Sequence, residues 1–156
     1  MKKLTTFICL MLILAYACDD SMTPVSKPLT VRLINDSASK FSIFSIRMQN
    51  MGPADKAPVP IGDWSSNIIE GNRRIEPGEI ETLVLSIPSG EWNFCRLGVI
   101  DSSGNEVYLH EQNGYQATGN YTITHWGSDS RRVHVFLDYD VQKKLIFVKS
   151  WSDFAE

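Results

Sequence analysis

Residues 76–100 read EPGEIETLVLSIPSGEWNFCRLGVI, and no other stretch indicates the fold class as clearly. Two largely apolar runs, 80–87 and 91–100, each follow a turn signal, Pro77-Gly78 and Pro88-Ser89-Gly90. Proline presets the backbone dihedral that a turn needs, and glycine adopts conformations that other residues avoid. Apolar runs of this length between such turns predict two β-strands.

The same succession of strand and turn signals continues on both sides. Leu29, Val31 and Leu33 alternate with Thr30 and Arg32, as in a strand that is buried on one face. Further strands are predicted at 41–48, 106–112, 121–126, 131–139 and 144–149, with hairpin loops at 101–105 and 140–143. Residues 63–69 fit either a short helical turn or an irregular strand.

About eight strands without a convincing amphipathic helix predict an all-β chain. No strand–helix–strand alternation occurs, so a parallel sheet is not expected. Strands at this spacing predict an antiparallel β-sandwich, either Ig-like or transthyretin-like. Trp151 and Phe154 follow the last predicted strand and are expected to lie in a tail that closes one end of the sandwich.

Composition excludes several classes of protein. The chain has 156 residues, of which 43% are hydrophobic and 21% charged, so it can bury the core of one domain and is not generally disordered. A net charge of -3 argues against nucleic acid as a partner. A single long apolar run excludes a membrane protein with several spans.

The first 18 residues, MKKLTTFICLMLILAYAC, have the layout of a secretory signal peptide. Lys2 and Lys3 precede an apolar run, and the small residues Ala15 and Ala17 follow it. The run is too short to span a bilayer of ~30 Å as a helix. We therefore expect residues 1–17 to be removed as a signal peptide, residues 18–28 to form a tether, and residues 29–156 to form the β-sandwich domain.

Leu14-Ala15-Tyr16-Ala17-Cys18 resembles the lipobox of bacterial lipoproteins. Ala15 stands where the usual box has Leu, a looser form familiar in Bacteroidetes. The resemblance implies a diacylglycerol on the Cys18 thiol, an acyl chain such as palmitate on its amine, and a membrane as a partner through this anchor. It places the chain in the cell envelope, at the outer rather than the inner membrane. The alternatives are cleavage after Ala17 that leaves Cys18 free, and a retained N-terminal helix.

The stretch 34–113 resembles a small secreted bacterial β-sandwich domain. The matching motifs are turns and aromatic positions: Asn35-Asp36-Ser37, Trp64, Pro77-Gly78, Gly90-Glu91-Trp92 and Asp101-Ser102-Ser103-Gly104. Trp92-Asn93 stands where that family often has Tyr-Asp. The resemblance supports the fold and implies no activity. In size, lipobox and Pro-Gly turn, the chain also resembles the lipid-anchored β-sandwich lipoproteins of type VI secretion.

No motif indicates a catalytic, cofactor or metal site, and none is expected. His110, His125 and His134 are the only histidines, and their spacing is not that of a metal-binding pair. The hairpin composition of residues 101–106 is a better explanation of that loop than calcium binding. Cys95 has no partner for a disulfide once Cys9 is removed and Cys18 is lipidated, and a buried thiol is expected there.

The aromatic residues are the strongest indication of binding. Trp64 and Tyr115 lie in predicted loops, so we expect them to be the more exposed rings, able to stack on a glycan or anchor a protein partner. The competing explanation is that aromatic rings fill the core.

The sequence therefore favours a lipid-anchored, non-enzymatic binding or interaction module of the cell envelope. One alternative is a subunit of a secretion or envelope assembly complex. The other is a hydrolase whose residues come from separate loops, such as Asp63, His110 and His125.

Overall fold

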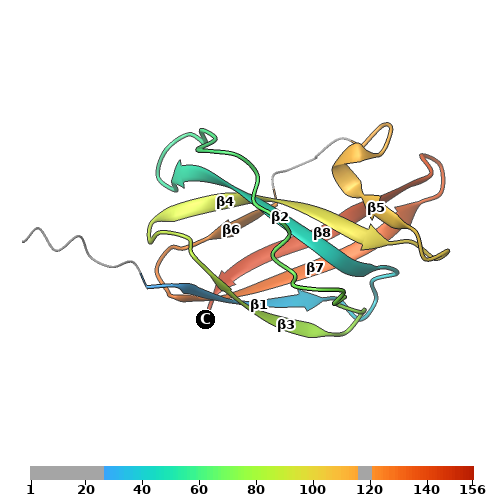
Figure 1. The fold of residues 1–156 in the computed structure, drawn as a ribbon, viewed down its shortest axis with the longest axis horizontal. Coiled ribbons are helices and arrows are strands. Elements are labelled where there is room, and N and C mark those ends of the chain that lie inside the picture. The colour runs from blue at the N-terminus through green and yellow to red at the C-terminus, as the bar shows by residue number, and fades with distance from the viewer. Residues whose placement is uncertain (1–26, 116–120) are drawn as a thin grey trace, which may run out of the picture.

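Two β-sheets pack face to face in the computed structural model, which describes residues 27–115 and 121–156 (Figure 1). One sheet has the strand order β3-β1-β7-β8; in the other β4 lies between β2 and β5 and also pairs with β6. The strands are β1 (Leu29–Asn35), β2 (Ser42–Pro53), β3 (Ile80–Leu85), β4 (Glu91–Ile100), β5 (Glu106–Tyr108), β6 (Thr122–Thr124), β7 (Ser130–Asp140) and β8 (Leu145–Ala155). The predicted β-sandwich of about eight strands is thus confirmed.

The predicted signal peptide, Cys18 and most of the tether lie outside the described residues. Among the residues that are described, no helix has the length and apolar character needed to cross a membrane. The start of β1 and the C-terminus lie at the same end of the sandwich, which we call the tether end (Figure 1).

Side chains that alternate along the strands form the core between the sheets. Leu29, Val31 and Leu33 of β1 are fully buried, as the alternation in the sequence predicts. Burying one such side chain stabilises the fold by ~1.5–3 kcal/mol. The opposite sheet contributes further buried residues from its two longest strands: Ile43, Ile46 and Met48 from β2, and Cys95, Leu97 and Val99 from β4.

One strand pair departs from the antiparallel expectation. β1 pairs with β3 antiparallel but with β7 parallel, in a register that sets Thr30 beside Ser130. A parallel neighbour needs a long crossover, which is usually a helix. Here the crossover consists of β3 and the whole of the second sheet, so the absence of helices in the sequence did not exclude a parallel pair.

Residues 59–75 run along the free edge of β2. The Ser65 amide donates to the Met48 carbonyl (2.8 Å), and the Ile68 amide donates to the Ile46 carbonyl (2.9 Å). Ile75 exchanges two backbone hydrogen bonds with Ile43. The segment that the sequence left open between helix and strand therefore covers a sheet edge, which would otherwise present unpaired backbone groups.

The C-terminal residues are not a tail. β8 continues to Ala155, pairing with β7 along its length, and it includes Trp151 and Phe154. The Trp151 indole donates to the Thr122 carbonyl (2.9 Å). Serine and aspartate in this segment weakened the strand signal. The predicted strand at 106–112 is also shorter, because a 3₁₀ turn (η1, Leu109–Glu111) replaces its second half.

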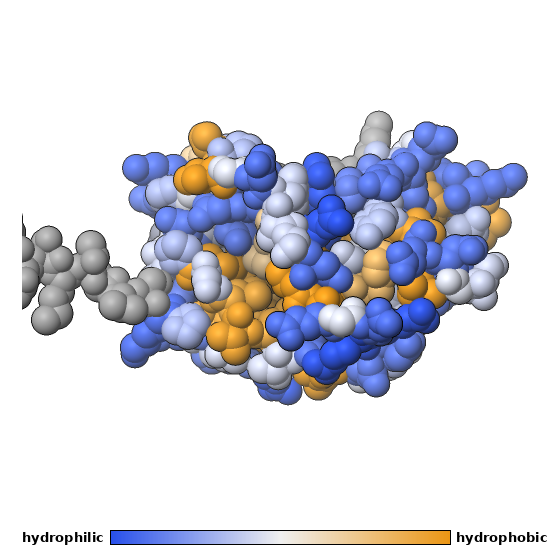
Figure 2. Space-filling model, in the orientation of Figure 1, coloured by the Kyte–Doolittle hydropathy of each residue, from blue (hydrophilic) through white to orange (hydrophobic). Residues whose placement is uncertain are grey.

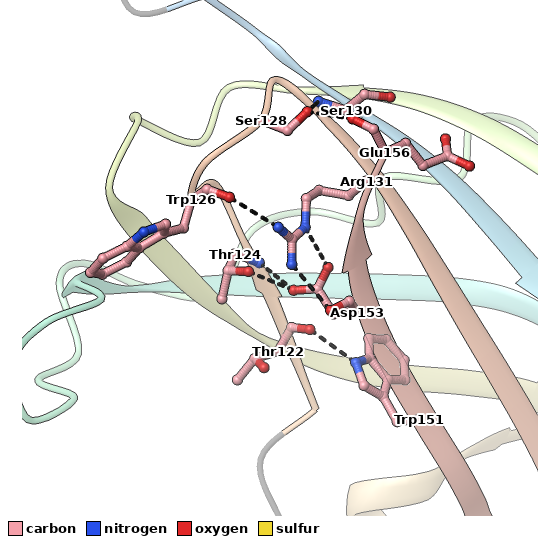
Figure 3. A network of polar contacts seen from close by, with 9 residues as sticks. All are labelled: Thr122, Thr124, Trp126, Ser128, Ser130, Arg131, Trp151, Asp153 and Glu156. Carbon is pink, nitrogen blue, oxygen red and sulfur yellow. Dashed lines mark hydrogen bonds and ion pairs between the residues drawn. The ribbon is translucent and has the colours of Figure 1, made fainter.

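A buried ion pair between β7 and β8 of one sheet also holds β6 of the other sheet, near the tether end (Figure 3). The Arg131 Nε donates to Asp153 Oδ1 at 2.7 Å, and both side chains are less than a tenth exposed. Asp153 Oδ2 accepts the backbone amide (2.9 Å) and the hydroxyl (2.7 Å) of Thr124 in β6. Arg131 also donates to the backbone carbonyls of Trp126 and Asp153. Every partner of this carboxylate thus comes from β6 or β7.

We predict that Asp153→Ala lowers the free energy of unfolding by about 3–5 kcal/mol, because it leaves the Arg131 guanidinium buried without a counter-charge. Chemical denaturation measures this loss. Glu156→Ala is the matched control, since Glu156 pairs with the more exposed Arg32 and Arg132, and it should cost less than about 1 kcal/mol. Equal losses in the two variants would contradict the assignment.

Candidate ligand-binding cleft

A cleft opens beside the middle of β4. β5 pairs with residues 98–100 of this strand and β6 pairs with residues 92–94, so residues 95–97 have no described strand on that side. The cleft there has a volume of about 410 Å³. Its principal side chains are Trp64, Phe94, Arg96, His110, Tyr115 and Tyr121.

The two aromatic residues that the sequence singled out line this same cleft. Trp64 comes from the segment that covers the edge of β2, and the Arg96 guanidinium lies 3.9 Å from the centre of its ring. Tyr115 approaches from the loop after η1 and packs partly against the core. Burial, followed by a hydrogen bond with Tyr121, raises the pKa of the Tyr115 phenol, so this ring is a neutral group near pH 7.

Exposure does not follow the expectation, because Trp64 and Tyr115 are half-buried. More exposed aromatic rings are Phe154 (63%), Trp126 (54%) and Tyr139 (39%). Figure 2 shows one side of the molecule, on which apolar residues lie mainly across the middle and hydrophilic residues surround them. The ring of Trp64 is partly covered by Arg96, and that contact depends on tertiary structure that loop composition does not reveal.

His110 and Arg96 supply the polar chemistry of the cleft. Burial, and then the charge of Arg96, lowers the pKa of His110, so its imidazole is neutral at pH 7. Its Nε2 lies 3.6 Å from a Glu111 carboxylate oxygen, while its Nδ1 is buried without a hydrogen-bond partner. A buried polar atom of this kind is costly unless it binds something.

The residues proposed for a hydrolase do not converge. His110 lines the cleft, but Asp63 and His125 do not. His125 is 1% exposed, and its Nδ1 and Nε2 contact the Ile87 carbonyl (2.6 Å) and the Asp129 carboxylate (3.0 Å). Both ring nitrogens of His125 are therefore occupied by contacts within the folded domain. His134 pairs with Asp36 at 3.2 Å, and within residues 27–115 and 121–156 no three His, Cys, Asp or Glu side chains gather as a metal site.

Two other candidates have structural explanations. Asp101 Oδ1 accepts the backbone amides of Ser103 and Asn105, both at 2.8 Å, which closes the hairpin loop as its composition indicates. The Asn105 side chain also lowers the pKa of Asp101. Cys95 lies at the base of the cleft but is 6% exposed, and burial raises the pKa of its thiol. A protonated, buried thiol is a poor nucleophile.

Comparison with known proteins adds no assignment: no family model, no curated protein and no solved structure matches the chain. The resemblances of the lipobox and of the turn motifs therefore stay predictions. Sequence reasoning missed Arg96, as well as Arg47 on the neighbouring strand. Each is a lone arginine inside a predicted strand, and only the pairing of the strands brings them together.

We predict that His125→Gln lowers the free energy of unfolding by about 1–3 kcal/mol, because the Ile87 carbonyl and Asp129 lose a buried partner. His110→Gln should cost less than about 1 kcal/mol, since it removes only an exposed contact with Glu111 and an edge contact with the Tyr108 ring. Urea denaturation of the two variants compares them directly. A larger loss for His110→Gln would mean that the roles of the two histidines are reversed.

Proposed function

We propose that this chain is a non-enzymatic binding module of the bacterial cell envelope, anchored through a lipid on Cys18, with its ligand in the cleft beside β4. The observation that carries the proposal is that Trp64 and Tyr115, far apart in the sequence, line one cleft of about 410 Å³. Ligand pockets have volumes of roughly 300–1,000 Å³ and combine aromatic walls with a few polar groups.

The chemistry of the cleft supports a glycan. The rings of Trp64 and Tyr115 provide apolar faces for a sugar ring, and neutral His110 provides a hydrogen-bonding group. Gln49 also lines the cleft, and its amide donates to the Gly62 carbonyl at 2.9 Å. The flat surface of a protein partner would fill this cleft less well than a sugar ring would.

The place where β1 begins supports the anchor. β1 begins at Leu29, ten residues after Asp19 in the sequence, at the tether end of the sandwich. The tether end would then face the membrane. The loops before β2, after β4 and between β7 and β8 lie at the other end, away from it (Figure 1).

One observation favours the alternative of a subunit in an envelope assembly. Val59 (63% exposed), Ile61 (55%) and Trp126 (54%) are apolar or aromatic side chains that water reaches. Trp126 shares a shallow depression with Pro53, the last residue of β2, and Asp55 of the loop that follows it. A partner subunit could bury this region, and cross-linking in cells followed by identification of the captured protein tests it.

For the anchor, we predict that cells incorporate radiolabelled palmitate into the wild-type protein and not into Cys18→Ala. Denatured wild-type protein should then contain one titratable thiol, Cys95, because Cys9 is removed and Cys18 is blocked. Two thiols would indicate cleavage without lipidation, and three an uncleaved signal. Either count, with no palmitate, would contradict the anchor.

For the cleft, we predict that Trp64→Ala and Tyr115→Ala each weaken glycan binding by about 5- to 150-fold, since stacking on one ring contributes about 1–3 kcal/mol. A glycan array probed with the full-length protein in non-ionic detergent identifies the ligand, and titration calorimetry gives the affinities. Trp126→Ala is the control, because that exposed ring lies outside the cleft. Loss of binding in the control alone, or no glycan bound at all, would contradict the proposal.

A further inference from the structure

Two arginines lie directly opposite each other on the outer face of the second sheet. Arg47 of β2 and Arg96 of β4 are register partners in the antiparallel pair. The Cβ atoms of such partners are ~4.5–5.5 Å apart, and like charges in this position destabilise a sheet. An arginine pair of this kind therefore calls for a counter-charge.

Neither arginine has one among the described residues. No ion pair joins a carboxylate to Arg47 or Arg96; each guanidinium lies against an aromatic ring instead. Four of the other five arginines are paired with carboxylates: Arg32, Arg73, Arg131 and Arg132. The fifth, Arg74, is exposed to solvent and has no ion pair among the described residues. Acidic residues outnumber basic ones in this chain, which has a net charge of -3. Even so, no carboxylate among the described residues forms an ion pair with Arg47 or Arg96.

The aromatic contacts hold both guanidinium groups near the cleft. Arg96 lies over Trp64 at 3.9 Å from the ring centre, and Arg47 lies over Tyr108 at 5.5 Å. The Tyr108 ring is in edge contact with His110, at 6.1 Å between centroids. Arg96 thus brings a positive charge into the aromatic lining of the cleft, and its register partner Arg47, outside that lining, is exposed to solvent.

We propose that Arg47 and Arg96 form an oxyanion subsite, and that the ligand of the cleft is an acidic saccharide with a carboxylate or phosphate on its sugar ring. This rests on the proposed function and specifies its ligand class. The planar donor fork of arginine matches the geometry of both anions. The anion lies between the two guanidinium groups, while Trp64 and Tyr115 contact the sugar ring. A bound anion offsets the repulsion between the two guanidinium groups, because it is attracted to both.

The test uses two comparisons that separate the contribution of the ligand's negative charge from that of its sugar ring. Full-length protein in non-ionic detergent is titrated with uronic-acid oligosaccharides, each beside its uncharged methyl ester, and with sugar phosphates beside the parent sugars. We expect the charged member of a pair to bind at least tenfold more tightly. Arg47→Gln, at a residue outside the cleft lining, should remove that preference and leave the affinity for the uncharged member unchanged. Arg96→Gln should also remove the preference. Arg132→Gln, an exposed arginine of the opposite sheet, is the control and should keep the preference.

Equal affinity for acid and ester, with binding still lost in Trp64→Ala, overturns the oxyanion subsite and leaves the proposed function standing. No binding of any member of the panel overturns both. Preference for the acid that survives in both arginine variants also overturns the assignment of these two residues.

A second measurement does not depend on knowing the saccharide. In buffer of low ionic strength, Arg47→Gln should melt at a higher temperature than wild type, because it removes the like-charge pair. Inorganic phosphate at about ten times its dissociation constant should raise the wild-type melting temperature by roughly 3–6 °C, beyond the effect of chloride at equal ionic strength. Arg47→Gln should lose that shift and Arg132→Gln should keep it. The same phosphate response in Arg47→Gln and wild type overturns the subsite.

Discussion

The position of β6 depends on the buried carboxylate of Asp153. β6 has three residues and pairs only with β4, so its own sheet holds it weakly. Asp153 reaches across from β8 and accepts two hydrogen bonds from Thr124, while Arg131 neutralises it. Once β6 is fixed in this way, the backbone carbonyl of Tyr121 accepts the Cys95 amide at 2.7 Å, and the interval between β5 and β6 becomes the cleft. One ion pair inside the sandwich therefore shapes a surface on its outside.

Features that depend on neighbouring residues in the chain could be predicted from the sequence. Alternation of apolar and polar residues gave β1, and the runs at 80–87 and 91–100 gave β3 and β4 to within two residues. The loops around Gly104 and at 140–143 were recognised because hairpin turns require particular residue types. The aromatic residues of the candidate site were found for the same reason, since Trp64 and Tyr115 each stand out in a polar loop.

Features that depend on strand register could not be predicted. The facing of Arg47 and Arg96 follows from the alignment of β2 with β4, which includes a bulge between Ile43 and Ser45. A shift by one residue would place the arginines on opposite faces of the sheet. The edge-covering role of residues 59–75 and the parallel neighbour of β1 depend in the same way on segments distant in the chain.

The parallel pairing of β1 with β7 determines when the chain can fold. β1 is an inner strand, and its partner Ser130 is synthesised a hundred residues after Thr30. Until the last quarter of the polypeptide has emerged, half of the backbone groups of β1 have no strand to bind. Pairings this distant in sequence also form slowly, on the scale of milliseconds to seconds. A nascent polypeptide with this topology therefore completes the inner part of its first sheet only after β7 has been synthesised.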